Sequence, residues 1–198
     1  MPLRMIILAT NNRHKVAEIT GILSVLPIRL LSAKDFPEFP DPEETGETLE
    51  QNARIKAQEV FAAFGEWAVA DDTGLEVDAL GGRPGVHSAR FAGPQCSFQD
   101  NMQKLLRLMT DVPQRQRTAR FRTVAALATA ESTVCFSGTI EGSITTEQRG
   151  NGGFGYDPIF FVPSAGQSLA EVTADAKNAI SHRGEAFRIV AEHLRTRL

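Results

Sequence analysis

The stretch that decides the fold reads A-D-D-T-G-L-E-V-D-A-L-G-G-R-P-G-V-H-S-A-R-F-A-G over residues 70–93. An apolar run that ends at Ala70 leads directly into two adjacent carboxylates, Asp71 and Asp72. Removing carboxylates from water is costly unless a cation or hydrogen bonds satisfy them. We therefore expect a cation beside this pair. The Thr-Gly step that follows predicts a turn between one strand near residues 67–70 and another near residues 75–80.

Length, composition and charge narrow the class of protein. The 198 residues fit one domain, 1–198, and 42% hydrophobic with 23% charged residues is ordinary for a soluble globular chain. The formal net charge of -3 argues weakly against a broad nucleic-acid-binding face. No segment approaches the roughly 20 apolar residues that a membrane helix needs. We expect a cytoplasmic protein with no nucleic-acid or membrane partner.

Near the N-terminus, a polar turn separates a predicted strand from a predicted helix. Residues 5–9 form a continuous apolar run typical of a strand covered on both faces, and Val16, Ile19 and Leu23 then recur at helical spacing. This geometry offers backbone N–H groups and a helix N-terminus to an anion. A lysine at a helix start opposes the helix dipole, so a bound phosphate would explain Lys15. A solvated turn with a surface lysine is the alternative.

A second helix is predicted over residues 49–64. Thr48-Leu49-Glu50-Gln51 has the form of a capping box, and Gly65 would end the helix. Asn52 and Lys56, four residues apart, would share one face of it. They are either site residues or ordinary surface residues.

The second half of the chain predicts a hairpin followed by a glycine-rich loop. Residues 119–130 and 133–144 are long strand-like runs, and residues 150–158 read G-N-G-G-F-G-Y-D-P. The glycines permit the backbone to approach a ligand closely, or merely tight turns. Phe154 and Tyr156 are unusual, because turns seldom carry two aromatic residues unless something packs on them. Early strand–helix alternation and a late hairpin together predict an α/β fold with a mixed sheet.

These features together favour chemistry on a nucleoside triphosphate. Hard carboxylates without histidine or cysteine partners favour Mg²⁺ over zinc. Dispersed lysines and arginines suit a polyphosphate, and an aromatic side chain on a glycine-rich loop could stack on a base. The pattern G-x-x-x-x-G-K-[ST] is absent, so a P-loop NTPase is not expected.

Five segments occur in the order and spacing of one known family: T-N-N-R-H-K (10–15), E-E-T-G (43–46), A-D-D-T-G-L (70–75), the loop 150–158 and S-H-R-G (181–184). The chain resembles the inosine triphosphate pyrophosphatase family, whose members hydrolyse dITP, ITP and XTP to the monophosphate and pyrophosphate. The resemblance implies an elongated α/β fold with two lobes around a long curved mixed β-sheet and an active-site cleft between the lobes. It also implies Mg²⁺ dependence, a homodimer, and removal of altered nucleotides before they enter DNA or RNA.

The resemblance further implies roles for individual residues. Asp72 would bind the metal together with Glu43 or Glu44, and it also matches the family's proton acceptor. Asp71 would be a second metal ligand or would orient the site, and Lys15 would neutralise charge on the phosphates. The candidate catalytic residues are therefore Lys15, Asp71 and Asp72. The candidate substrate-binding residues are Thr10, Asn11, Asn12, Arg13, His14, Lys15, Lys56, Thr73, Phe154, Gly155, Tyr156, Asp157, Lys177, His182 and Arg183.

Two departures from the family pattern affect these expectations. Asn11 stands where the family usually has glycine, and because asparagine tolerates a left-handed backbone we expect the loop to persist. His87 and Phe91 replace two tyrosines of the loop around Arg90, which removes two hydroxyl groups.

Two other functions remain open at this point. One is a related pyrophosphatase for other altered nucleotides, such as methylated pyrimidine triphosphates. The base-pocket segments speak against it, because donors such as His182 or Arg183 suit the 6-oxo group of hypoxanthine and xanthine. The other is a nucleotide-sensing protein without catalysis, which would not need the Asp71–Asp72 pair and Lys15 together.

Overall fold

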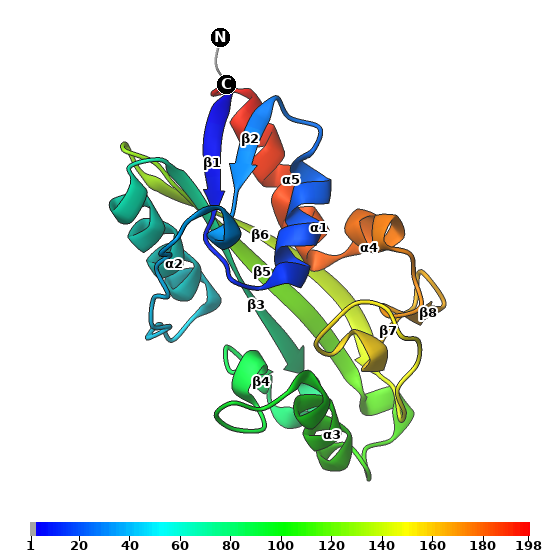
Figure 1. The fold of residues 1–198 in the computed structure, drawn as a ribbon. Helices are drawn as coiled ribbons and strands as arrows, with labels where there is room; N and C mark the ends of the chain where they lie inside the picture. Colours follow the sequence, from blue (N-terminus) through cyan, green and yellow to red (C-terminus); the bar gives the residue numbers. More distant parts are fainter. Residues whose placement is uncertain (1–2) are drawn as a thin grey trace. The chain divides into compact units, whose positions relative to one another are not determined.

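The computed structural model describes residues 3–198, which form five α-helices and eight β-strands (Figure 1). The helices are α1 (Arg13–Leu23), α2 (Leu49–Phe64), α3 (Phe98–Leu108), α4 (Ala174–Ile180) and α5 (His182–Arg195). The strands are β1 (Arg4–Leu8), β2 (Ile28–Leu31), β3 (Trp67–Val77), β4 (Pro84–Gly85), β5 (Thr118–Ala128), β6 (Thr133–Ile144), β7 (Phe160–Val162) and β8 (Gln167–Ser168).

The strands form one mixed sheet in the order β2-β1-β3-β5-β6-β7-β8, with β4 paired to β3. Strand β1 runs parallel to both β2 and β3, as expected where helices connect the strands. Strand β4 is antiparallel to β3, and β7 is antiparallel to both β6 and β8. The predicted α/β class with a mixed sheet is confirmed, and β5 and β6 are neighbours as the predicted hairpin requires.

Local chemistry sets both ends of α2. The Thr48 side chain accepts a hydrogen bond from the backbone N–H of Gln51, whose own side chain accepts one from the N–H of Thr48. At the other end Gly65 takes the left-handed conformation, φ 71°, and its N–H donates to the carbonyl of Phe61. The predicted bounds of this helix are correct.

The predicted turn after the aspartate pair is wrong. Strand β3 is 11 residues long and continues without a break through Asp71, Asp72, Thr73 and Gly74. Residues 78–80, expected to end the second strand, form a 3₁₀-helix. The strand can continue because both carboxylates find cationic partners from distant parts of the chain. Ion pairing removes the reason for the chain to turn toward water there.

The chain divides into two compact units, each with its own core. Unit 1 contains the described part of Met1–Asp72 together with Thr123–Gly138 and Ser181–Leu198, and unit 2 contains Thr73–Arg122 and Thr139–Ile180. The core of unit 1 includes Ile6, Leu8, Ile19, Leu23, Val69, Leu127, Phe187, Val190 and Leu194. The core of unit 2 includes Leu75, Val77, Met102, Leu105, Phe121, Ile144, Ile159, Phe160 and Leu169.

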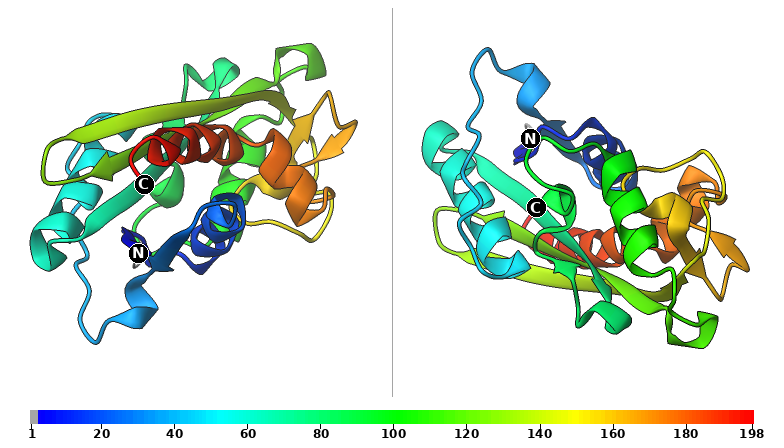
Figure 2. Two further views of the ribbon diagram at one scale, coloured as in Figure 1. Left: turned by 90° about the horizontal axis from the view of Figure 1, so that it is seen from above. Right: turned by 90° about the horizontal axis from the view of Figure 1, so that it is seen from below.

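In unit 1, helix α5 packs against α1 and lies along β6 (Figure 2). The approach to β6 is close, because a Cβ on Gly138 would lie 2.1 Å from the carbonyl oxygen of His182 and 2.6 Å from the N of Ala186. Glycine at this position therefore lets the first turn of α5 sit directly on the strand. Among the described residues, no helix combines the length and apolar character needed to cross a bilayer.

Candidate active site

The aspartate pair on β3 is buried, with Asp71 1% and Asp72 6% exposed. Neighbouring side chains of a strand point to opposite faces, and the two carboxylates accordingly have different partners. Asp71 pairs with Lys15 and Arg183, whereas Asp72 pairs with Lys56. Three cationic side chains of unit 1, Lys15, Lys56 and Arg183, thus lie where one cation was expected.

Asp71 is a fixed anion. Its Oδ2 lies 3.1 Å from Lys15 Nζ and 3.1 Å from an Arg183 guanidinium nitrogen. Burial opposes its charge, but Lys15 and Arg183 outweigh burial and hold the pKa of Asp71 well below its usual range. A carboxylate held this way orients cations and is poorly suited to accept a proton.

Arg183 connects Asp71 to helix α1. Its Nη1 donates to Glu18 Oε2 at 2.6 Å, while Nε and Nη2 donate to Asp71. The side chain is 1% exposed. Burial acts against the charged form, yet Asp71 and Glu18 raise the pKa of Arg183. The structure therefore places Arg183 in a buried ion-pair network rather than at an open surface.

Lys15 lies in the first turn of α1, beside this network. The side chain of Asn12 caps the helix by accepting from the N–H groups of His14 and Lys15 at 2.9 and 3.3 Å. Burial lowers the pKa of Lys15, although Asp71 works in the other direction. Its unfavourable position for the helix dipole is offset by this ion pair, and its Nζ still has donors for a further anion.

On the other side of β3, Lys56 of α2 bridges Asp72 and Glu44. Its Nζ lies 2.7 Å from Asp72 Oδ1 and 2.8 Å from Glu44 Oε1. Burial, and then the nearby Glu44, raise the pKa of Asp72 even though Lys56 opposes them. Burial disfavours the charge on Lys56, but the two carboxylates outweigh it and raise its pKa.

Asn52 completes this group and was not among the residues predicted for the site. Its Oδ1 accepts from the backbone N–H of Gly46, and its Nδ2 lies 3.5 Å from Asp72 Oδ2. A Cβ on Gly46 would lie 2.6 Å from Asn52 Oδ1, so only glycine permits this contact. Asn52 thereby links Gly46, in the segment before α2, to Asp72 on β3.

Glu44 and Asp72 suit a divalent cation. Both present carboxylate oxygens, the ligands that Mg²⁺ prefers, and both already flank one positive charge, the Lys56 ammonium. Glu43 is exposed, so the geometry favours Glu44 as the second ligand. In the described part of the chain, no group of three or more His, Cys, Asp or Glu side chains could hold a metal unaided.

Residues 9–12, which contain Asn11, connect β1 to α1 as an irregular segment. Among the described non-glycine residues, only Gln95 has a positive φ, so position 11 does not require the left-handed conformation that we expected asparagine to tolerate. Instead, Asn11 Nδ2 donates to Asp41 Oδ1 at 3.3 Å. Thr10 Oγ1 accepts from the N–H of Asn12, whereas Arg13 and His14 are exposed.

A second group of predicted residues lies within unit 2. Lys177, 4% exposed, donates to Asp157 Oδ2, and its Nζ lies 4.8 Å from the centre of the Phe154 ring. Asp157 Oδ2 also accepts from the N–H of Phe154 at 2.7 Å. Gly155 has φ 64°, which gives the loop its tight turn. The structure thus brings together Phe154, Asp157 and Lys177.

Three other predicted residues lie within the core or within regular secondary structure. Tyr156 is buried in the core of unit 2, where its hydroxyl donates to the carbonyl of Ser88 at 2.8 Å and burial raises its pKa. His182 is the buried first residue of α5, following the Ser181 cap. Thr73 is a partly buried residue within β3. Sequence alone gave no sign that Tyr156 would be core.

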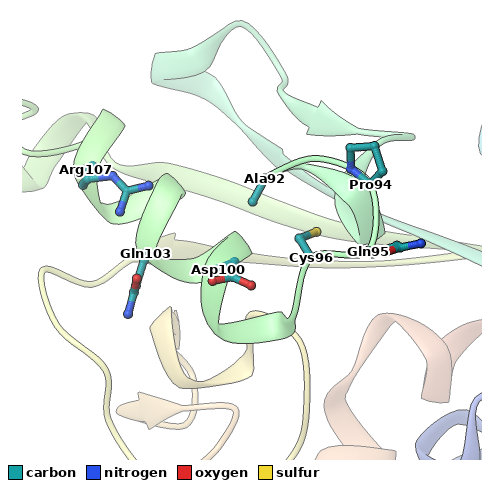
Figure 3. Close-up of a pocket in the computed structure, with 7 residues that line it drawn as sticks. All are labelled: Ala92, Pro94, Gln95, Cys96, Asp100, Gln103 and Arg107. Carbon is teal, nitrogen blue, oxygen red and sulfur yellow. The ribbon is translucent and has the colours of Figure 1, made fainter.

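One cavity in unit 2 contains none of the predicted residues. It has a volume of about 430 Å³ and is lined by residues along α3 and in the loop before it (Figure 3). Its lining residues are Ala92, Pro94, Gln95, Cys96, Asp100, Gln103 and Arg107. Asp100 and Arg107 are the charged members of this lining.

Comparison with known proteins settles the family. A model of the Ham1 family matches residues 6–193. The chain belongs to the Ham1 family. This confirms the family resemblance predicted from the five sequence segments.

Relatives and solved structures in the Ham1 family match nearly the whole chain. A dITP/XTP pyrophosphatase of Geobacter sulfurreducens is 48% identical over 190 residues, 96% of each chain. One of Halalkalibacterium halodurans is 49% identical over 183 residues, 92% of this chain and 94% of its own. The solved Ham1 proteins of Staphylococcus aureus and Coxiella burnetii share 36% and 40% identity, with TM-scores of 0.87 and 0.88, and cover 98% of this chain and 100% of theirs.

Proposed function

We propose that the protein hydrolyses non-standard purine nucleoside triphosphates, namely dITP, ITP and XTP, to the monophosphate and pyrophosphate. The observation that carries the proposal is the contact of two partly buried lysines, Lys15 and Lys56, with the buried Asp71 and Asp72 in a member of the Ham1 family. Cations beside acidic metal ligands are what a triphosphate and its counter-ion require. The activity would remove altered nucleotides before they enter DNA or RNA.

In this reaction, water attacks the α-phosphorus and negative charge develops on phosphate oxygens. Lys15, held by Asp71, is placed to neutralise that charge without having to reorganise. Asp72 would orient the attacking water or take its proton. Asp71 would act indirectly, by fixing Lys15 and Arg183.

Glu44 and Asp72 would hold a divalent cation, which we take to be Mg²⁺ because of their hard oxygen ligands. When bound, Mg²⁺ supplies further charge neutralisation on the phosphate oxygens. Glu43, which is exposed, is not needed for this role. Lys56, Lys15 and the backbone and side chains of residues 10–14 would bind the triphosphate.

Lys177, Asp157 and Phe154 support the preference for a 6-oxopurine. A 6-oxopurine presents a carbonyl acceptor beside a ring N–H donor, and an ammonium next to a carboxylate is the complementary pair. Adenine presents the reverse pattern and would leave both groups unsatisfied, which is an expensive mismatch. The Phe154 ring would stack on the base. Arg183, engaged with Asp71 and Glu18, is less suited to read the base than the sequence suggested.

The family resemblance also supports three statements about the whole protein. We propose that residues 1–198 act as one catalytic domain, that the protein is a homodimer, and that it works in the cytoplasm on the pool of nucleoside triphosphates.

The deciding experiment is pyrophosphate release with Mg²⁺ from ITP, XTP, dITP, ATP and GTP in parallel. We expect rapid release from the first three and slow release from ATP. Equal rates on ATP and ITP would overturn the base preference. No release from any of the five would favour the nucleotide-sensing alternative.

A further inference from the structure

Lys56 occupies the position between the two carboxylates assigned to the metal. Its ammonium is within 2.8 Å of one oxygen of Asp72 and one oxygen of Glu44, and its side chain is only 12% exposed. The two carboxylates lie close enough to share one cation, so they would repel each other if that charge were removed. A single lysine is therefore the counter-ion of both.

The contacts of Asp72 are divided between its two oxygens. Oδ1 accepts from Lys56, while Oδ2 faces the amide of Asn52 at 3.5 Å. A Mg²⁺ ion binds oxygen ligands at about 2.0–2.1 Å and needs lone pairs directed at it. The ammonium uses such lone pairs on both Asp72 and Glu44. Two cations cannot use the same oxygens at these distances without strong mutual repulsion.

We propose that Lys56 is a displaceable counter-ion, which holds Glu44 and Asp72 in the free enzyme and competes with the divalent cation for them. The inference rests on the proposed metal site at Glu44 and Asp72. The free enzyme then binds the metal weakly, and tight binding requires the phosphates of a substrate to accept the displaced ammonium. A lysine suits this role, because its charge is compact and its four-carbon stem lets it move.

Metal binding without nucleotide tests the competition directly. Mn²⁺ is the probe, and its free concentration is followed by electron paramagnetic resonance during titration of the protein at one near-neutral pH. Lys56→Gln removes the charge and keeps a hydrogen-bond donor. We expect it to bind Mn²⁺ at least about tenfold more tightly than the wild type, because one nearby positive charge is gone.

Thermal unfolding supplies a second measurement that does not depend on activity. Without metal, Lys56→Gln should unfold at a lower temperature than the wild type, because Glu44 and Asp72 lose their shared cation. Adding Mg²⁺ should raise Tm more for this variant than for the wild type. Lys34→Gln is the matched control: it changes the net charge equally at an exposed lysine of unit 1 and should behave as the wild type in both measurements.

Equal or weaker Mn²⁺ binding by Lys56→Gln would overturn the proposal. If that variant does not fold, Lys56→Arg serves instead: its guanidinium keeps the charge, so Mn²⁺ binding should be no tighter than in the wild type, and tighter binding would contradict competition. If neither wild type nor variant binds Mn²⁺, and Glu44→Gln changes nothing, the metal site itself is misplaced. Competition observed in a protein that releases no pyrophosphate would overturn the function and leave this inference standing.

Discussion

Asp71 and Arg183 are 112 positions apart in the sequence, yet two nitrogens of Arg183 donate to one oxygen of Asp71 at 3.2 and 3.1 Å. This contact joins β3 to the first turn of α5, and through Glu18 it also joins α1. Because both partners are almost completely buried, the pair fixes the geometry of the surrounding site. Loss of either partner would leave the other charge buried without full compensation, which destabilises the fold.

Arg183→Met should lower the free energy of unfolding by about 3–5 kcal/mol, because it leaves a buried carboxylate with one fewer cation. Urea unfolding followed by circular dichroism measures the change. Arg195→Met, on the exposed end of the same helix, removes only a surface pair with Glu192 and should change stability by less than about 1 kcal/mol. Equal stability of the two variants would show that the buried network contributes little.

Asp72→Asn should reduce kcat by at least about 100-fold, the range expected when a general base or metal ligand is removed. The fold should remain, since an amide retains the shape of the side chain. Activity on dITP and the far-ultraviolet circular dichroism spectrum test the two parts. Asp78→Asn is the control: its exposed carboxylate binds Thr118 and Arg120, and its loss should leave kcat unchanged. Normal activity in Asp72→Asn would remove the central residue of the proposed mechanism.

Local signals predicted some parts of the structure well. The capping box at Thr48 and the glycine at position 65 set the ends of α2, because both act through neighbouring backbone groups. The need of Asp71 and Asp72 for cations was also predictable, since burial of carboxylates follows from an apolar strand. These conclusions depend only on residues close in sequence.

Long-range contacts account for what the sequence did not predict. Asp71 and Asp72 were expected at a strand end. Strand β3 continues past them because their cationic partners come from α1, α2 and α5, which local sequence does not reveal. Glu44, rather than Glu43, contacts Lys56, and this depends on the path of an irregular loop, which no periodicity describes. Asn52 was noticed only for sharing a helix face with Lys56, and its contacts with Gly46 and Asp72 come from folding.

Phe98→Ala should raise KM for dITP about two- to tenfold, with kcat nearly unchanged. The Phe98 ring lies 6.0 Å from the ring of Phe154, the proposed stacking partner of the base, and such aromatic pairs contribute about 0.5–1.5 kcal/mol. Steady-state kinetics separate the two constants. Leu108→Ala is the matched control, because Leu108 is on the same helix and 44% exposed against 42% for Phe98. A similar KM in both variants would contradict a role for Phe98.

Stability should fall as the pH drops below about 6.5, in part because of His193. Its Nε2 is buried without a hydrogen-bond partner in the described structure, and its ring packs on Phe136. Burial, and then Arg197, lower the pKa of His193, so the unfolded chain binds a proton that the folded chain resists. The contribution is complete above the unfolded pKa and is lost as the pH falls from there through the lower pKa of the folded state.

Thermal unfolding of wild type and His193→Gln between pH 8 and pH 5 measures this contribution. The variant should lose less stability than the wild type over that interval. His87→Gln, at an exposed position, should follow the wild type. A parallel decline of wild type and His193→Gln would assign the pH dependence to other groups.

Because β3 is continuous, its register with β1 fixes the directions in which Asp71 and Asp72 point. Trp67, Ala68 and Val69 pair with Ile6, Ile7 and Leu8 of β1, and this pairing decides which way each following side chain points. Insertion or deletion of one residue between Val69 and Asp71 would turn Asp71 toward Lys56 and Asp72 toward Lys15 and Arg183. Both acids would remain in the chain, yet each would meet the other's partners. The division of the two aspartates into a partner of Lys15 and Arg183 and a partner of Lys56 is therefore encoded by position along the strand, since the two side chains are chemically identical.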